Sequence, residues 1–225
     1  MQLNVAVISD VVCPWCFIGK RRLEKGIQLF LQQTDDRHAS VNVRWLPFQL
    51  NPGLPPDGIS REDYLRQKFG ARAGEIYARV SEAAATVDLP LAFERIQVQP
   101  NTLNAHRLIH YAERFDRQDA MVEQLFRGYF FDGANLCDLA KLADIAAGVG
   151  CDRDKTLDYL RGVDDREDID AADQRFREMG LSGVPFFVFA NKFGVSGAQE
   201  PENLARAMLR AHTESRSTPP VDVPA

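Results

Sequence analysis

The motif Cys13-Pro14-Trp15-Cys16 lies where a strand-like segment gives way to a helical pattern. Before it runs Leu3-Asn4-Val5-Ala6-Val7-Ile8, an apolar and β-branched segment that predicts a buried strand. After it, apolar residues recur at helical spacing to about residue 33, which predicts a helix beginning at Pro14. Proline lacks an N–H and has a φ angle suited to the first helical turn. Both cysteines are therefore expected at a helix N-terminus.

This position predicts redox chemistry for the two cysteines. The free N–H groups and the dipole of a helix start favour a negative charge, here a thiolate on Cys13. A thiolate is the attacking species in disulfide exchange, and Cys16 lies one turn further on. The pattern indicates that Cys13 attacks or is attacked and that Cys16 resolves the mixed disulfide. Half of a zinc site is the alternative, but zinc usually takes four ligands and the chain has no second Cys-x-x-Cys.

Length and composition set the broad class. The 225 residues suffice for one large domain or a core with an insertion, and 45% of them are hydrophobic. A net charge of −5 argues against binding to nucleic acid or an anionic membrane. No apolar run approaches the ~20 residues that cross a bilayer, and no secretory signal is visible. A full-length gene product with this sequence is expected in the cytoplasm.

The other two cysteines are Cys137 and Cys151. A short helix is predicted between them, over residues 139–149, with Asp138 as its N-cap. A helix of about ten residues separates its ends by ~15 Å, whereas a disulfide needs Cα atoms within about 7 Å. We therefore expect no bond between these two residues and interpret them as small, at least half-buried apolar side chains. The sequence assigns them no functional role.

The remaining pattern predicts a discontinuous α/β domain. A second strand is expected at 41–46, and a loop rich in proline and glycine follows at 47–58. Helical periodicity then continues until Gly180, after which two strands at 184–190 and 193–196 precede a last helix from Pro201. The two α/β parts are each too small to hold a core alone. We expect one domain from residues 1–58 and 180–214, a helical insertion at 59–179 and a disordered tail at 215–225.

This element order, with the cysteine motif at the first helix, resembles the thioredoxin fold in its DsbA-like form. The predicted fold class is therefore α/β, a thioredoxin-like fold with a large all-helical insertion. Within that superfamily the chain looks most similar to the FrnE subfamily of cytoplasmic oxidoreductases. The segments that support the resemblance, besides the cysteine motif, are Pro47-Phe48-Gln49-Leu50-Asn51-Pro52, Asn101-Thr102-Leu103-Asn104-Ala105-His106-Arg107, Gly183-Val184-Pro185-Phe186-Phe187 and Val195-Ser196-Gly197-Ala198-Gln199.

The resemblance implies a cis peptide bond at Val184–Pro185, facing the cysteines. From the residues alone, a trans proline at a strand start is equally permitted. The Val184 backbone would then lie beside Cys13, where an extended substrate segment could hydrogen-bond as an added strand. A disulfide- or dithiol-containing protein or small molecule is the implied partner, with glutathione as a candidate redox partner and no bound cofactor or metal. The implied catalytic residues are Cys13 and Cys16, and the implied substrate-binding residues are Pro14, Trp15, Val184 and Pro185.

Glutathione-dependent chemistry is the main competing function. Kappa-class glutathione transferases and 2-hydroxychromene-2-carboxylate isomerases resemble this chain around Pro47-Phe48 and Val184-Pro185. Their residue at the position of Cys13 is typically serine. The chain also has Gly197-Ala198-Gln199-Glu200 where those families carry Gly-Ser-Asp-Arg. These differences favour thiol–disulfide exchange over the isomerase or transferase alternative, but leave open whether the chain oxidises, reduces or isomerises disulfides.

Two further clusters have competing interpretations. His106 and His110 share a helix face, but two histidines are too few for a metal site. Packing or hydrogen bonding is favoured for His106, with Asn104 and Arg107 as candidate members of the same polar cluster. A second cluster could line a substrate groove, although helical core packing is more usual. It comprises Phe126, Tyr129, Phe130 and Phe131.

Overall fold

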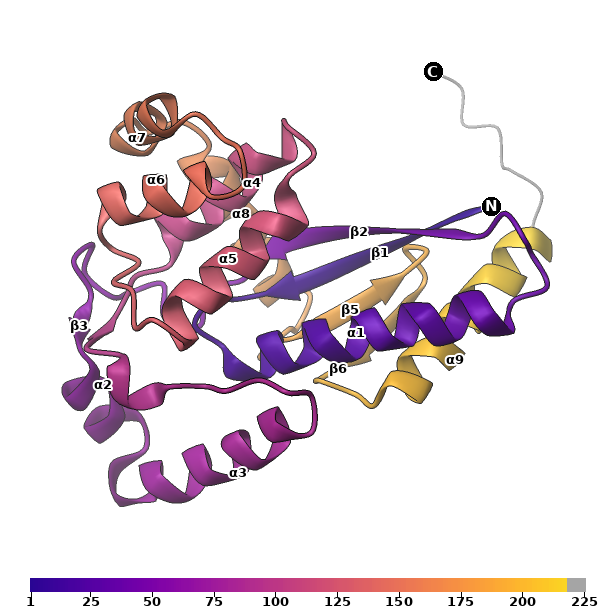
Figure 1. The fold of residues 1–225 in the computed structure, drawn as a ribbon, viewed down its shortest axis with the longest axis horizontal. Coiled ribbons are helices and arrows are strands. Elements are labelled where there is room, and N and C mark those ends of the chain that lie inside the picture. Colours follow the sequence, from indigo (N-terminus) through magenta and orange to yellow (C-terminus); the bar gives the residue numbers. More distant parts are fainter. Residues whose placement is uncertain (218–225) are drawn as a thin grey trace.

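The computed structural model describes residues 1–217 and is built around a four-stranded mixed sheet (Figure 1). The strand order is β2 (Ser40–Pro47), β1 (Gln2–Ser9), β5 (Phe186–Phe189) and β6 (Phe193–Ser196). β1 pairs with β2 in parallel and with β5 antiparallel, and β5 pairs antiparallel with β6. The predicted strand–helix–strand unit at the start of the chain is therefore present, and the last two strands complete the same sheet.

The first strand joins the two halves of the α/β domain. Val5 and Val7 lie opposite Phe189 and Phe187 of β5, and all four side chains are buried in the main core. Side chains of a strand alternate between its faces, so this spacing of two places them on one side of the sheet. Residues more than 170 positions apart thus share one core.

Helices α1 (Pro14–Gln33) and α9 (Pro201–Ser217) pack against each other. Gly26 makes this close packing possible, because a Cβ there would lie 3.0 Å from the Pro201 carbonyl oxygen and 3.1 Å from the Leu204 Cβ. Helix α9 continues through residues 215–217, so the prediction that the tail begins at 215 is wrong by three residues. The helix meets no proline before Pro219, which is why it extends. The rest of the predicted tail lies outside the described residues.

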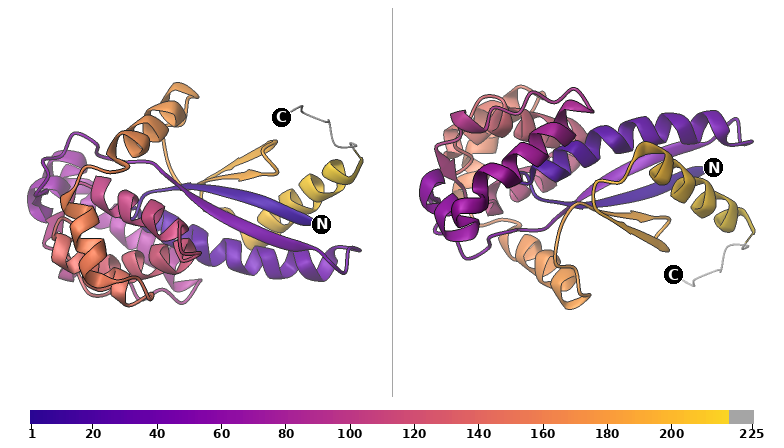
Figure 2. Two further views of the ribbon diagram at one scale, coloured as in Figure 1. Left: turned by 90° about the horizontal axis from the view of Figure 1, so that it is seen from above. Right: turned by 90° about the horizontal axis from the view of Figure 1, so that it is seen from below.

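The insertion gathers at the end of the sheet where β1 meets α1 (Figure 1). Helix α8 lies on the opposite side of the sheet from α1 (Figure 2). The insertion is not wholly helical, because β3 (Ile59–Ser60) and β4 (Val98–Gln99) form a two-stranded ribbon too short to show any periodicity in the sequence. Its helices are α2 (Arg61–Lys68), α3 (Ala73–Ala85), α4 (Leu103–Glu113), α5 (Gln118–Phe130), α6 (Leu139–Ala147), α7 (Arg153–Arg161) and α8 (Arg166–Glu178), with 3₁₀ turns at Gly70–Arg72 and Phe93–Arg95.

A fully buried arginine fastens α4 to the end of α7. The Arg107 guanidinium donates hydrogen bonds to the carbonyls of Tyr159 (2.9 Å), Leu160 (3.0 Å), Gly162 (3.0 Å) and Asp164 (2.8 Å). Tyr159, Leu160 and Gly162 lie at the end of α7, where carbonyls run short of intrahelical donors, and Asp164 lies in the loop that follows. Arg107 also binds Asn104, as the predicted polar cluster requires. His106 faces elsewhere and does not belong to that cluster, because residues adjacent on a helix point in different directions.

Every helix within residues 1–217 is too short or too polar to qualify as a membrane-spanning segment.

Candidate active site

The turn from β1 into α1 places Cys13 at the helix start. Cys13 is the N-cap residue with extended backbone angles, and Pro14 follows in the first turn. The Cys13 N–H donates to the Asp10 carbonyl at 3.0 Å, and the Cys13 carbonyl accepts from the Cys16 N–H at 3.0 Å. No acidic side chain occupies this first turn. The positive end of the helix dipole therefore faces the Cys13 sulfur, and no carboxylate within that turn opposes it.

The loop before β5 lies against the first turns of α1. The Cys13 Sγ donates to the Val184 carbonyl oxygen at 3.6 Å, and the Val184–Pro185 peptide bond is cis. Gly19 allows the two segments to approach, since a Cβ at this position would lie 3.0 Å from the Pro185 Cγ. The structure thus places Cys13 beside Val184 and Pro185, which follow it by about 170 residues in the chain.

Both thiols of the motif are buried, and only the tryptophan between them is exposed. Cys13 and Cys16 are 5% and 1% exposed, whereas Trp15 between them is 39% exposed. All four cysteines of the chain lie in the described part and are free thiols. Cys137 is half-buried and Cys151 is buried. The indole of Trp15 is therefore the exposed surface next to the redox pair.

The buried Cys16 thiol resists ionisation. Burial away from water and the adjacent Cys13 sulfur raise the pKa of Cys16 well above its ordinary value. The Ser9 hydroxyl and the Asp10 backbone act in the opposite direction, but they do not offset the burial. Cys16 therefore carries its proton at neutral pH and needs a proton acceptor before it can act as a nucleophile.

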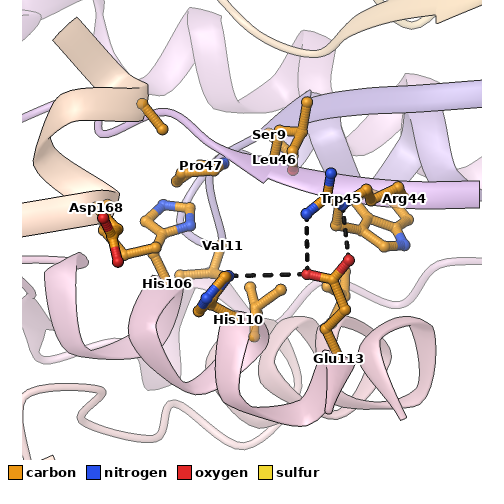
Figure 3. Close-up of a pocket in the computed structure, with 14 residues that line it drawn as sticks. Ser9, Val11, Arg44, Trp45, Leu46, Pro47, His106, His110, Glu113 and Asp168 are labelled. Atoms are coloured by element: carbon orange, nitrogen blue, oxygen red, sulfur yellow. Dashed lines mark hydrogen bonds and ion pairs between the residues drawn. The ribbon is translucent and has the colours of Figure 1, made fainter. Parts of the chain in front are cut away.

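A buried acid–imidazole pair lies directly behind the motif. Asp10 is fully buried, its Oδ1 lies 3.3 Å from the His106 Nε2, and its Oδ2 accepts from the Leu50 N–H at 2.7 Å. His106 lies on the wall of a cavity between α4, α8 and the sheet (Figure 3). The predicted hydrogen-bonding role of His106 is confirmed. Its partner was not identified from sequence, although Asp10 stands only three residues before Cys13.

A buried arginine of the insertion, Arg61, lies among polar side chains. The buried Arg61 guanidinium binds the Gln99 amide oxygen and the Tyr77 hydroxyl. Burial raises the pKa of Tyr77, the Arg61 charge opposes this shift, and the negative charge of Cys13 adds to it. The cluster therefore lies within electrostatic reach of Cys13. In the sequence, Arg61 stands in a polar helix start and looks like a solvated residue, so no signal distinguished it.

The aromatic cluster of α5 forms core rather than a groove. Phe126, Tyr129 and Phe130 have no exposed surface, and Phe131 is half-buried. Phe17 stacks on Phe126 with ring centroids 4.8 Å apart and an interplanar angle of 11°. The favoured interpretation of core packing is confirmed.

Within residues 1–217, no three His, Cys, Asp or Glu side chains converge as they would to hold a metal ion.

Comparisons with known proteins agree with this geometry. The family model described as a DSBA-like thioredoxin domain matches residues 4–209. The crystal structure of a probable DsbA oxidoreductase from Streptomyces coelicolor superposes with a TM-score of 0.85 at 29% identity, covering 98% of this chain and 93% of that one. A 2-hydroxychromene-2-carboxylate isomerase gives 0.71 at 16% identity, covering 95% and 98%. The cytosolic disulfide reductase DsbM from Pseudomonas aeruginosa, solved with glutathione, gives 0.60 at 16% identity with the same coverage. The last two likenesses concern the fold alone.

Proposed function

Because this chain belongs to the family of DSBA-like thioredoxin domains, we propose that it is a thiol–disulfide oxidoreductase in which Cys13 is the nucleophile and Cys16 the resolving thiol. One observation carries the proposal: Cys13 is the N-cap of α1 and its Sγ lies 3.6 Å from the Val184 carbonyl, with Cys16 one turn behind it. A helix start stabilises the thiolate that disulfide exchange requires. The same turn keeps the second sulfur close enough to complete the exchange.

The proposed reaction has two displacement steps. The Cys13 thiolate attacks one sulfur of a substrate disulfide, a new S–S bond forms to Cys13, and the other substrate sulfur leaves as a thiolate. Cys16 then loses its proton and its thiolate attacks the Cys13 Sγ, which closes the Cys13–Cys16 disulfide and releases the second substrate thiolate. The substrate gains two electrons and the enzyme loses two. The reverse sequence oxidises a substrate dithiol.

The substrate is proposed to bind on the side of Cys13 that Trp15 and the Val184 loop border. Trp15 offers apolar surface next to the reactive sulfur, and the Val184 backbone offers an edge along which an extended segment can hydrogen-bond. Pro14 and Pro185 fix the backbone on the two sides of this position. Both a protein segment and a small disulfide such as oxidised glutathione fit this arrangement.

Membership of the FrnE subfamily and a cytoplasmic location complete the proposal. The cysteine motif and the segment around His106 support the subfamily, and DsbM is described as cytosolic and was solved with glutathione. Glutathione is therefore the proposed first redox partner to test. The reduction potential of the Cys13–Cys16 pair relative to that of glutathione decides whether the enzyme oxidises or reduces its substrates.

The proposal is tested by equilibrating the protein with reduced and oxidised glutathione over a wide range of ratios. Mass spectrometry after acid quenching measures the fraction with a Cys13–Cys16 disulfide. We expect reversible closure at a defined potential, with Cys137 and Cys151 remaining reduced. The Cys16→Ser variant is the matched control, since it can form only the mixed disulfide.

Absence of closure at every ratio would overturn the oxidoreductase proposal. Non-covalent binding of glutathione together with isomerisation of a 2-hydroxychromene-2-carboxylate would then favour the isomerase alternative. That alternative rests on the fold shared with the isomerase structure, and fold alone is weak support for an activity.

A further inference from the structure

A cavity lies between α4, α8 and β2, which is an edge strand of the main sheet. Its volume is ≈ 140 Å³, and its walls come from β1 and the turn after it, β2, α4, α5 and α8 (Figure 3). Within residues 1–217, neither α1 nor the loop that carries Val184 and Pro185 contributes to these walls. The proposed thiol–disulfide exchange therefore gives this cavity no role.

We propose that this cavity is a second ligand site, which takes a small uncharged aromatic alcohol with its ring against the apolar walls and its hydroxyl on His106. Phenol is the simplest molecule of this class. The site goes beyond the proposed exchange, because neither cysteine of the motif lines the cavity. The size of the cavity, its walls and the placement of its polar groups each support one part of the assignment.

The size and the walls of the cavity suit one aromatic ring. The buried apolar side chains that line it include Val11, Trp45, Ile109, Val122 and Ile169, each at most 6% exposed. An apolar cavity of about 150 Å³ stays dry and binds benzene, so a volume of ≈ 140 Å³ admits a molecule of that size. The indole of Trp45 offers an aromatic wall against which a ligand ring can pack edge-on or offset. An aromatic ligand is therefore favoured over an aliphatic one.

One ring nitrogen of His106 is left for a ligand. The side chain lines the cavity and is 3% exposed, and its Nε2 lies 3.3 Å from the Asp10 Oδ1. When Nε2–H donates to that carboxylate, the Nδ1 of the neutral imidazole is an acceptor, and in the described part of the chain no donor hydrogen-bonds to it. Burying a hydroxyl costs free energy unless the hydroxyl is hydrogen-bonded. A ligand that donates to Nδ1 therefore fits better than the same ring without a donor.

The charged groups that line the cavity oppose an anionic ligand. The Glu113 carboxylate lies 2.7 Å from the Arg44 Nε and 3.7 Å from the His110 Nδ1, so the guanidinium is already paired (Figure 3). Asp168 adds a second carboxylate from α8. A ligand carboxylate would meet two like charges, and a charge of either sign loses its hydration among the apolar walls. The ligand is therefore expected to be uncharged.

A second, polar hollow adjoins the cavity and sets where a larger ligand would extend. It shares Arg44 and Glu113 with the cavity and is also lined by Asn42, Asp116 and Gln118. The Arg44–Glu113 ion pair thus stands between an apolar and a polar space. A polar substituent on the ring can pass this pair and remain hydrated. Phenol is therefore the core of the expected ligand class and does not set its upper size.

The experiment uses Trp45 as its reporter. The chain has two tryptophans, so Trp15→Phe leaves Trp45 as the only one. Phenol is titrated into this reduced protein while the tryptophan emission is followed, and Tm is measured with and without phenol. Benzene, which has no donor, and benzoate, which is charged, are the comparison ligands. In the same background, Ala172→Phe fills the cavity from α8, and Ala171→Phe, exposed on the same helix, is the matched control.

We expect saturable phenol binding with a Kd of about 0.1–1 mM, as suits a ligand of so few atoms, and a rise in Tm because the ligand binds the native state. Benzene should bind about threefold to tenfold more weakly, which is the range of one hydrogen bond, and benzoate should cause no change. Ala172→Phe should abolish phenol binding, whereas Ala171→Phe keeps Kd within about twofold. With ¹⁵N-labelled histidine, phenol but not benzene should shift the Nδ1 signal of His106, which His106→Gln identifies.

Absence of saturable phenol binding in both readouts would overturn the proposal. Phenol binding that persists in Ala172→Phe would place the ligand elsewhere and overturn it equally. Equal affinity for phenol and benzene, with an unchanged His106 signal, would exclude an alcohol held by that imidazole. Should Ala172→Phe fail to fold, Ala172→Leu takes its place and should weaken phenol binding by about tenfold or more. None of these readouts requires thiol–disulfide exchange, so this proposal and the proposed function can fail separately.

Discussion

The first turn of α1 carries two cysteines, and the surroundings of their sulfur atoms differ. On one side, Cys13 meets the Val184 carbonyl and the half-exposed Trp15. On the other, Cys16 is sealed next to Asp10, and Phe17 stacks on Phe126 of the insertion. The two cysteines look equivalent in the sequence, and the fold buries both, but only Cys13 lies against the Val184 carbonyl next to the partly exposed Trp15. The insertion therefore contributes to the asymmetry of the redox pair as well as to the core.

The largest expected effect comes from exchanging either sulfur for oxygen. Cys13→Ser removes the attacking atom, so turnover of oxidised glutathione falls to the rate of the uncatalysed reaction. Cys16→Ser leaves the attack intact but removes resolution, so the mixed disulfide with glutathione accumulates. Activity assays and mass spectrometry distinguish the two outcomes, with Cys137→Ser as the control. Full turnover by either variant, or identical behaviour of both, contradicts the division of roles.

The buried side is predicted to dominate stability. Phe17 has no exposed surface and contacts three phenylalanines of α5 and its end, with ring centroids 4.8 to 6.2 Å apart. Truncation leaves a cavity between α1 and the insertion, so Phe17→Ala should lower the free energy of unfolding by about 3–5 kcal/mol. Urea denaturation of the reduced protein measures the change. A decrease in the free energy of unfolding of less than about 1 kcal/mol would show that Phe17 contributes little to the packing of α1 against the insertion.

The exposed side is predicted to affect the substrate instead. Trp15→Ala removes a 39% exposed ring from the surface beside Cys13, so its cost in stability should be about 1 kcal/mol or less, well below that of Phe17→Ala. Lost apolar contact should raise KM for a peptide disulfide more than for oxidised glutathione, because the peptide covers more surface. Steady-state kinetics with both substrates test this. An unchanged KM for both would exclude Trp15 from the binding surface.

The contrast between the surroundings of Cys13 and those of Cys16 also separates what the sequence could predict from what it could not. The Cys13 side follows from local signals: a β-branched run ending at Ser9, a proline in the first helical turn and helical spacing that ends at Gln33 as predicted. The Val184 loop was placed beside Cys13 through the family resemblance, which relates residues that local periodicity cannot connect. A local N-cap signal also succeeded in the insertion, where Asp138 accepts backbone N–H bonds at the start of α6 as expected.

The Cys16 side depends on contacts that no local pattern specifies. His106 is 96 residues from Asp10, and the sequence predicts only a packing or hydrogen-bonding role for it without naming a partner. Arg61 and Arg107 look alike in the sequence, yet one binds side chains near Cys13 and the other caps a distant helix. Such pairings are decided by how the insertion packs on the sheet. The chemistry of the motif could therefore be predicted, but its supporting residues could not.

The smallest expected effect concerns the ion pairs that join α1 to α5 beyond the aromatic stack. Burial alone would raise the pKa of Glu123, but the hydrogen bond from Arg21 and the charges of Lys20 and Arg21 outweigh it and lower that pKa. A depressed pKa contributes stability above the unfolded value of 4.5, and this stability is lost as the pH falls through the folded value. We expect Glu123→Gln to cost about 1 kcal/mol at pH 7, as partly exposed ion pairs do.

The pH dependence distinguishes this charge effect from a packing effect at the same position. Lowering the pH from 7 to 3 carries the wild-type carboxylate towards its protonated form, so the difference in unfolding free energy between wild type and Glu123→Gln should shrink. Urea denaturation at both pH values measures it, with the exposed Glu82→Gln as the control. A difference that stays constant from pH 7 to pH 3 would mean that Glu123 acts through its shape. The interface between α1 and the insertion would then be stabilised by the packing of Phe17 and not by these charges.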